Sequence, residues 1–129
     1  FMTVWEAIEQ AERILPGQAA PEEELDPRWQ AIIEIGEFIE EEPDAVWSFI
    51  TRWGCNGDED LRAAVATCLL EHLLEYYFER FFPKVEEAAQ ANLLFAHTFL
   101  MCSKFGQSEE PGNSRRFNRL RRQCRKIGL

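Results

Sequence analysis

The sequence contains no apolar run near the roughly 20 residues that a helix needs to cross a bilayer. The start of the chain also lacks the basic-then-apolar pattern of a secretory signal, because charged residues interrupt the apolar positions between Trp5 and Ile14. Glycine-rich phosphate-binding loops are missing as well, which excludes the common nucleotide-binding motifs. We therefore expect a cytoplasmic protein without membrane insertion.

The four cysteines, Cys55, Cys68, Cys102 and Cys124, are widely spaced. They form no CxxC pair, and His72 and His97 are too far apart in the sequence to be the paired histidines of a standard zinc site. Cys68 and Cys124 fall within apolar stripes, where a free thiol behaves as a small hydrophobic group. Together with the missing secretory signal, this favours free thiols over disulfides. We expect no metal site and no cofactor.

One histidine has carboxylates close to it in the sequence. Glu75 follows His72 one helical turn later, and Glu71 stands beside it. An HxxE pair on a helix can bind a metal or hold a general base, so an enzyme or metal protein centred on His72 and these carboxylates is one hypothesis. A di-iron site would need a second pair, and His97 has no Glu three or four residues away. The sequence therefore favours a protein that is not an enzyme.

Composition and helix signals predict an all-α fold. The chain has 129 residues, of which 46% are hydrophobic, and this is enough for a real core. Caps and first-turn prolines mark helix starts, while glycine or the residue before proline marks helix ends. We expect a single domain of about six to seven helices, covering residues 3–15, 26–42, 43–53, 58–82, 83–105 and 114–129. Residues 83–106 form either one helix, or two if Asn92 caps the second.

The longest helix is expected between Asp58 and Phe82, because the interior of this run contains no Gly or Pro. At about 100° per residue, one face collects Leu61, Val65, Leu69, Leu70, Leu73, Tyr76 and Tyr77. The opposite face collects Thr67, Glu71, Glu75 and Glu79. An apolar face this wide needs neighbours on several sides, so we expect this helix at the centre of the domain.

The helix expected at residues 26–42 begins with the start signal Asp26-Pro27 and ends before Pro43. Its apolar face collects Trp29, Ile32, Ile33, Ile35 and Ile39. Gly36 lies on the same face, where glycine costs about 1 kcal/mol relative to alanine. We therefore expect a neighbouring helix to approach closely at Gly36.

A short helix and a tight turn precede the sequence DEDLRAAVATCLLEHL, which opens with Asp60, Leu61, Arg62 and an alanine-rich turn. This order resembles a HEAT-type repeat over residues 43–82. The resemblance implies antiparallel helix pairs and assigns Asp60 and Arg62 to polar contacts between repeats. A second proline-started segment begins at Pro83, within the usual repeat period. Residues 83–106 carry no second copy of the signature, so an irregular helical bundle is the alternative.

Charge divides the chain into two parts. Residues 1–113 form an expected acidic helical domain with seven basic and 23 acidic residues, a formal charge of −16. Residues 114–129 form an expected basic C-terminal helix with seven basic residues and no acid. Phe117, Leu120, Cys124 and Ile127 lie along one side of this helix. We expect it to dock on the domain through Phe117, Leu120 and Ile127, with its arginines toward acids.

A basic helix can also bind an acidic partner, a membrane surface or nucleic acid, since Arg and Lys neutralise phosphates. A nucleic-acid-associated protein acting through the C-terminal helix is therefore a further alternative. The acidic body would repel phosphates within a Debye length of about 8 Å and beyond. For this reason the sequence does not favour nucleic acid as the partner.

The acidic surface favours a function in protein binding. Ten acids and a single base, Arg28, lie between residues 22 and 44. A dense negative face speeds association with basic proteins. We therefore expect a protein-binding module with a basic partner, possessing the character of an inhibitor or immunity protein. The expected partner-binding residues are Glu34, Glu37 and Glu41, on the polar face of their helix, and Trp47, outside its own helix's apolar stripe.

Overall fold

Side chains at the expected positions cap the helices. In the computed structural model, which describes residues 1–21 and 24–127, Thr3 and Glu6 form the predicted capping box, with Thr3 Oγ1 accepting from the Glu6 amide at 3.1 Å. Asp26 accepts from the amide of Arg28. Asn92 Oδ1 accepts from the amide of Phe95 at 3.0 Å, so the two-helix alternative for residues 83–106 is confirmed.

The described residues form an all-α fold without strands, and their apolar side chains make up one core. The α-helices are α1 (Val4–Ile14), α2 (Pro27–Gly36), α3 (Pro43–Trp53), α4 (Glu59–Val65), α5 (Glu71–Ala91), α6 (Leu93–Leu100) and α7 (Pro111–Ile127). A π-helical segment, η1 (Ala66–Leu70), joins α4 to α5, and a short 3-10 helix, η2 (Gly106–Glu109), precedes α7. No helix among residues 1–21 and 24–127 is long and apolar enough to cross a membrane.

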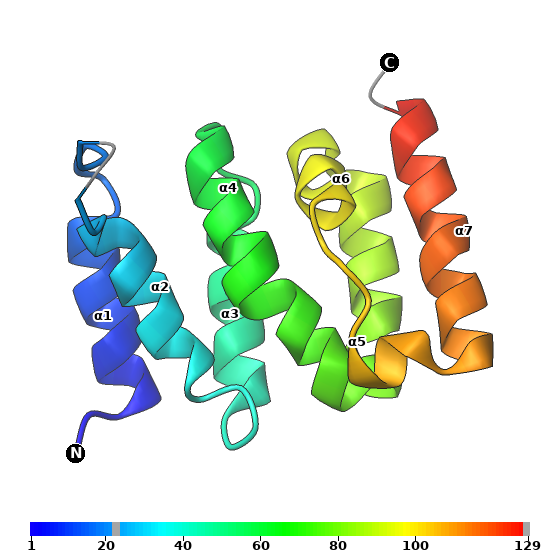
Figure 1. Ribbon diagram of the computed structural model, residues 1–129, viewed down its shortest axis with the longest axis horizontal. Helices are drawn as coiled ribbons and strands as arrows, with labels where there is room; N and C mark the ends of the chain where they lie inside the picture. The colour runs from blue at the N-terminus through cyan, green and yellow to red at the C-terminus, as the bar shows by residue number, and fades with distance from the viewer. Residues whose placement is uncertain (22–23, 128–129) are drawn as a thin grey trace.

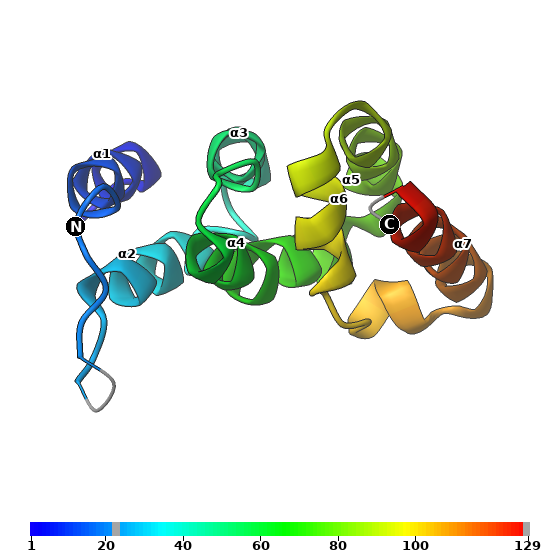
Figure 2. The ribbon, with the colours of Figure 1, turned by 90° about the horizontal axis from the view of Figure 1, so that it is seen from above.

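The helices stand side by side along the long axis of the molecule, from α1 at one end to α7 at the other (Figure 1). Neighbouring helices run antiparallel. Seen from above, α1, α3 and the last part of α5 lie in one layer, and α2 and α4 lie in the other (Figure 2). Arg28 in α2 ties the first pair of helices to the second, because its buried guanidinium contacts Asp58 and Asp60 at the start of α4. Arg62 instead contacts the nearby carbonyl of Asn56.

The prediction of an uninterrupted helix over residues 58–82 is wrong. The helix breaks at Tyr77, where the backbone leaves the helical region (φ −138°, ψ 50°). The Tyr77 hydroxyl donates to the carbonyl of Glu40, and the free amide of Phe78 donates to Gln107 Oε1 at 2.8 Å. The chain therefore reverses direction at Tyr77. Pro83, expected to begin a helix, lies inside the helical run that follows the break.

Because of the π-helical segment, the buried and exposed faces of the helix that follows it differ from the predicted ones. A π turn holds one extra residue, which rotates everything after it by about 100° relative to a regular helix. Tyr76, expected in the core, is 43% exposed. Glu71, expected on the solvent face, is only 6% exposed. Leu69 and Leu73 are fully buried, as predicted.

The α2 helix is shorter than expected, because it ends at Gly36 and residues 37–41 form turns. The close approach at Gly36 is confirmed, since a Cβ there would stand 3.1 Å from the carbonyl oxygen of Cys68 in η1. Ile32, Ile35 and Ile39 are buried. Ile33 is 44% exposed, so its expected place in the core is wrong.

The basic C-terminal helix begins at Pro111 rather than at Ser114. Phe117, Leu120 and Cys124 are buried, and the Phe117 ring lies 4.7 Å from that of Phe99 in α6. Ile127 is 50% exposed and does not join this contact. The reason is position, since Ile127 is the last residue of the helix and extends past the surface that α7 covers.

Candidate partner-binding groove

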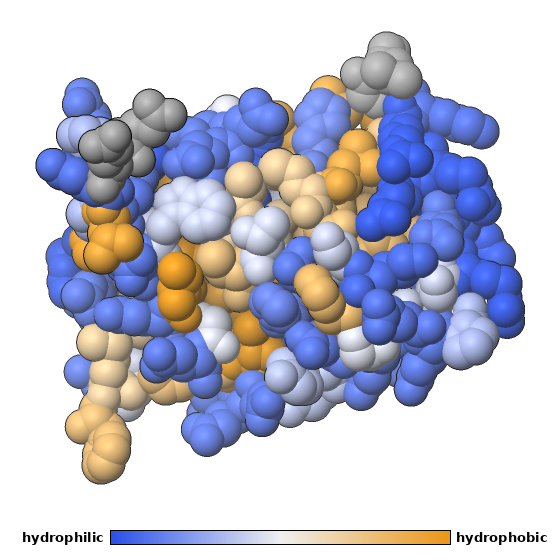
Figure 3. Space-filling view, viewed as in Figure 1, coloured by the Kyte–Doolittle hydropathy of each residue, from blue (hydrophilic) through white to orange (hydrophobic). Residues whose placement is uncertain are grey.

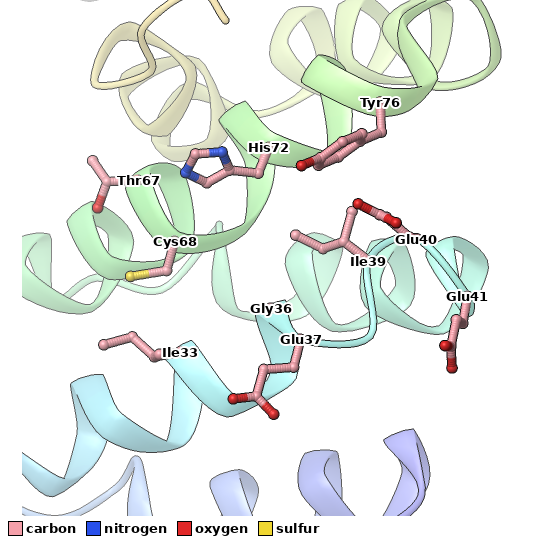
Figure 4. Close-up of a pocket in the computed structure, with 10 residues that line it drawn as sticks. All are labelled: Ile33, Gly36, Glu37, Ile39, Glu40, Glu41, Thr67, Cys68, His72 and Tyr76. Atoms are coloured by element: carbon pink, nitrogen blue, oxygen red, sulfur yellow. The ribbon is translucent and has the colours of Figure 1, made fainter. Parts of the chain in front are cut away.

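A groove of about 630 Å³ lies between the end of α2 and the helix that runs from α4 into α5 (Figure 4). It exists because α2 stops at Gly36 and the next residues turn away, while the π segment brings a different set of side chains to the facing wall. Its lining residues are Ile33, Gly36, Glu37, Ile39, Glu40, Glu41, Thr67, Cys68, His72 and Tyr76.

The floor of the groove is apolar. Gly36 and Cys68 lie in contact there, and Ile39 closes the floor between the two elements. Ile33 and Tyr76 stand at the sides and remain 44% and 43% exposed. Figure 3 shows apolar surface along the middle of this face with hydrophilic side chains around it. Exposed apolar side chains inside a polar rim are the composition of an interaction site.

One wall of the groove is acidic. Glu37, Glu40 and Glu41 come from the turns after α2. The carboxylates of Glu75 and Glu40 raise the pKa of the Tyr76 phenol, because a phenolate would stand beside negative charge. No Lys or Arg belongs to the groove lining found in the described part of the chain. The local field therefore favours a cation.

His72 stands on the opposite wall, held by its neighbours. Its Nδ1 lies 2.8 Å from Glu75 Oε1, and its ring stacks on Phe105 with centroids 5.5 Å apart. Glu71 accepts from the amide of Ser103 at 2.9 Å, and burial raises the pKa of Glu71. Through these contacts Ser103 and Phe105, in the segment after α6, pack against the first turn of α5. Within residues 1–21 and 24–127, no three His, Cys, Asp or Glu side chains gather closely enough to hold a metal ion.

The structure brings three of the four predicted site residues together. Glu37 and Glu41 line the groove, and Glu34 joins them around a smaller depression beside it, next to Phe38. Trp47 lies elsewhere. It is half-buried in α3, and the ring centroids of Phe81 and Phe95 lie 5.9 and 6.1 Å from its own, in a tilted and an edge-to-face arrangement.

Trp47 is therefore not an isolated exposed anchor beside the three glutamates. Its outer edge lines a separate depression with residues of α5, among them Lys84 and Glu87. Both rings that pack against Trp47 come from α5 and α6.

Sequence reasoning missed the residues that give the groove its shape. In regular helices Ile33 and Tyr76 are expected on the apolar faces, but Ile33 is left uncovered on α2 and the π segment turns Tyr76 outward. Glu40 belongs to the acid run EFIEEEP, so its charge was visible in the sequence. The closeness of Glu40 to Tyr76 could not be predicted from the sequence, because it depends on the break at Tyr77.

The described residues form an all-helical fold, and the groove between α2 and α5 combines an acidic wall with an apolar floor. Comparison with protein-family models, curated proteins and solved structures gives no match to this chain.

Proposed function

We propose that this protein is a binding module whose groove holds a basic segment of a protein partner. The observation that carries the proposal is the pairing of an apolar floor with an acidic wall in one groove, without a cation among its lining residues in the described chain. An occupant with an apolar side chain between two Lys or Arg residues would satisfy both surfaces. Such a segment would place its apolar group against Ile33 and Tyr76 and its cations near Glu37 and Glu41.

The geometry supports rapid and specific capture. Acids at the rim of a groove attract a basic segment from a distance, which raises the association rate. The apolar floor then slows dissociation, because it buries surface on both partners. The helices around the groove are fixed by Arg28 and by the turn at Tyr77, so little ordering accompanies binding. Neutralising a basic partner, as inhibitors and immunity proteins do, is one use that fits these properties.

The HEAT-like pairing of helices stands as part of the same proposal. Asp60 makes the kind of contact between successive helix pairs that this resemblance implies, by accepting from Arg28 and from the indole of Trp29. A layered array of this type presents the inner helices of each pair along one face, and repeat proteins use such faces for binding. The groove lies on the layer that contains α2 and α4 (Figures 2 and 4).

The test uses a labelled peptide with Leu between two Arg residues, and the same peptide with Glu in place of Arg. We expect fluorescence polarisation to detect only the basic peptide. Glu37→Lys with Glu41→Lys should weaken binding at least tenfold, and more strongly at low salt than at high salt. The control pair Glu24→Lys with Glu109→Lys makes the same charge change at exposed acids outside the groove and should bind nearly as the natural protein does.

A second arm tests the apolar floor. Ile33→Ala should speed dissociation of the basic peptide with little effect on its association rate, since Ile33 carries no charge. If the Glu37→Lys, Glu41→Lys variant bound the peptide as tightly as the control variant and the natural protein do, the groove would not be the binding site. Loss of binding in both pairs alike would show that net charge alone attracts the peptide.

A further inference from the structure

The basic helix α7 carries more charge than the rest of the protein neutralises. Of its seven cations, Arg116 pairs with Glu79, and Arg121 donates to the carbonyl of Cys102. The other five, Arg115, Arg119, Arg122, Arg125 and Lys126, are exposed and form no ion pair within residues 1–21 and 24–127. Among the residues that the structure describes, the expected docking of the α7 arginines onto acids of the body therefore holds for Arg116 alone.

Four of these five cations form a line. Arg115, Arg119, Arg122 and Lys126 follow one another at helical spacings of four, three and four residues. At about 100° and 1.5 Å per residue, they fall within roughly 60° of arc and extend over about 16 Å. We call these four residues the basic stripe. Figure 3 shows the strongly hydrophilic surface that covers α7 at the right of the view.

The stripe lacks what a protein interface or a bilayer would need. The apolar residues Phe117, Leu120 and Cys124 face the core, and α7 exposes no aromatic side chain in its described residues. Protein interfaces concentrate their energy in buried apolar and aromatic anchors, and interfacial helices insert an apolar face into lipid. Single-stranded nucleic acids bind to exposed aromatic rings by stacking. None of these contacts is available along the stripe.

What the stripe does offer is a row of phosphate ligands. Three of its four members are arginines, whose planar guanidinium groups bind phosphate oxygens in pairs. Contacts to phosphate need no apolar anchor, because the binding free energy comes mainly from released counterions. A straight row of fixed cations suits a stiff, regularly charged polymer better than a flexible one.

Most acids of the body lie too far from the basic stripe to cancel its field. The densest acidic stretch, between residues 22 and 44, includes α2, which lies near the end of the molecule opposite α7 (Figure 1). Helices pack about 8–10 Å apart, so the elements between α2 and α7 separate the two charged regions by more than a Debye length of about 8 Å at physiological salt. Of the acids close to α7, Glu79 is already paired with Arg116, and Glu110 accepts from the side chain of Asn113 in the first turn.

We propose that the basic stripe of α7 binds the sugar–phosphate backbone of double-stranded nucleic acid without reading its sequence. The stripe and the groove lie on different elements, so this proposal does not depend on the function proposed for the groove. It assigns Arg115, Arg119, Arg122 and Lys126 to phosphate contacts.

The experiment measures binding of the whole protein to a labelled 20-base-pair DNA duplex by fluorescence anisotropy. Four phosphate contacts predict that the logarithm of the binding constant falls with the logarithm of salt concentration with a slope of about −3.6. Between 50 and 200 mM salt the affinity should therefore fall roughly a hundredfold. Duplexes of different sequence should bind within about twofold of each other.

The decisive variant is Arg115→Glu, Arg119→Glu, Arg122→Glu, which should bind the duplex at least a hundredfold more weakly at low salt. Arg13→Glu, Arg52→Glu, Lys84→Glu is its matched control, because it changes net charge equally at cations outside α7. The control should stay within about threefold of the natural protein. Circular dichroism and thermal melting should show both variants folded, since the altered side chains are exposed or lie in exposed ion pairs.

Three results would overturn the proposal. Duplex binding that survives in the α7 variant would place the contact elsewhere. Equal loss in the control would show a dependence on net charge rather than on the stripe. Polyglutamate that binds α7 as tightly as the duplex does, with the same loss in the α7 variant, would assign the stripe to an acidic protein instead.

Discussion

The Asp60 carboxylate lies 2.8 Å from the guanidinium of Arg28, and this ion pair joins the starts of α4 and α2. Arg28 is 3% exposed and also contacts Asp26 and Asp58, each at 3.2 Å. Thus one buried cation gathers three carboxylates from two helix starts. The acids themselves reach solvent, which limits the cost of desolvating the cluster.

Replacing Arg28 by Met should destabilise the protein by about 1.5–3 kcal/mol at pH 7, the usual value of hydrogen bonds to charged groups. Met keeps much of the side-chain volume, so the loss reports the polar contacts. Urea unfolding measures the change. A loss below about 0.5 kcal/mol would contradict the importance of this cluster.

The same cluster should make the free energy of unfolding depend on pH in the acid range. Although burial alone would raise them, the pKa values of Asp26 and Asp58 are lowered overall, because Arg28 donates hydrogen bonds to both. A carboxyl with a lowered pKa stabilises the folded state above its unfolded pKa of about 3.9, and this stability is lost as pH falls through the lower folded value. Unfolding free energies measured from pH 6 down to pH 2 should therefore decline less steeply in Arg28→Met than in the natural protein.

Leu73 in the central helix is fully buried, so shortening its side chain should destabilise the protein strongly. Leu73→Ala should cost about 2–5 kcal/mol, because it removes apolar contacts and leaves a cavity in the core. Leu25→Ala removes the same atoms at a position that is 80% exposed and should change stability by less than about 0.5 kcal/mol. Equal melting temperatures for the two variants would contradict the burial of Leu73.

The docking of α7 depends on Phe117, whose ring packs against Phe99 and Phe82. Phe117→Ala should lower stability by about 3–5 kcal/mol and increase the binding of the dye ANS as the apolar surface of α6 is uncovered. Ile127→Ala is the control on the same helix, since Ile127 is half exposed. A Phe117 variant that melts with the natural protein would show that α7 contributes no packing.

The turn that begins η2 needs glycine. Gly106 has φ +51°, and a Cβ there would stand 2.7 Å from Glu75 Cγ and 2.9 Å from the Glu75 carbonyl oxygen. Gly106→Ala should therefore cost about 1–3 kcal/mol. Gly57→Ala is the matched control, because no atom lies within 4 Å of the added methyl group. Thermal melting of the two variants should separate them clearly, and similar melting points would refute the strain at Gly106.

Local chemistry in the sequence determined where most helices begin. Thr3, Asp26 and Asn92 each accept a hydrogen bond from an amide two or three residues later, and such contacts form within one turn. The acidic character of the groove wall was also predictable, since Glu37 and Glu41 follow from the sequence alone. The stripe of Phe117, Leu120 and Cys124 could be found in the same way, from helical periodicity.

Only the tertiary structure decided where the central helix breaks and which side chains face the groove. The break at Tyr77 depends on Glu40 and Gln107, which lie 37 and 29 residues away from the groups that they bind. No local propensity encodes such contacts, because loop closure and packing select them only when the chain has folded. The π segment likewise turns Tyr76 outward by adding one residue to a turn, a change that periodicity counted at 100° per residue does not contain.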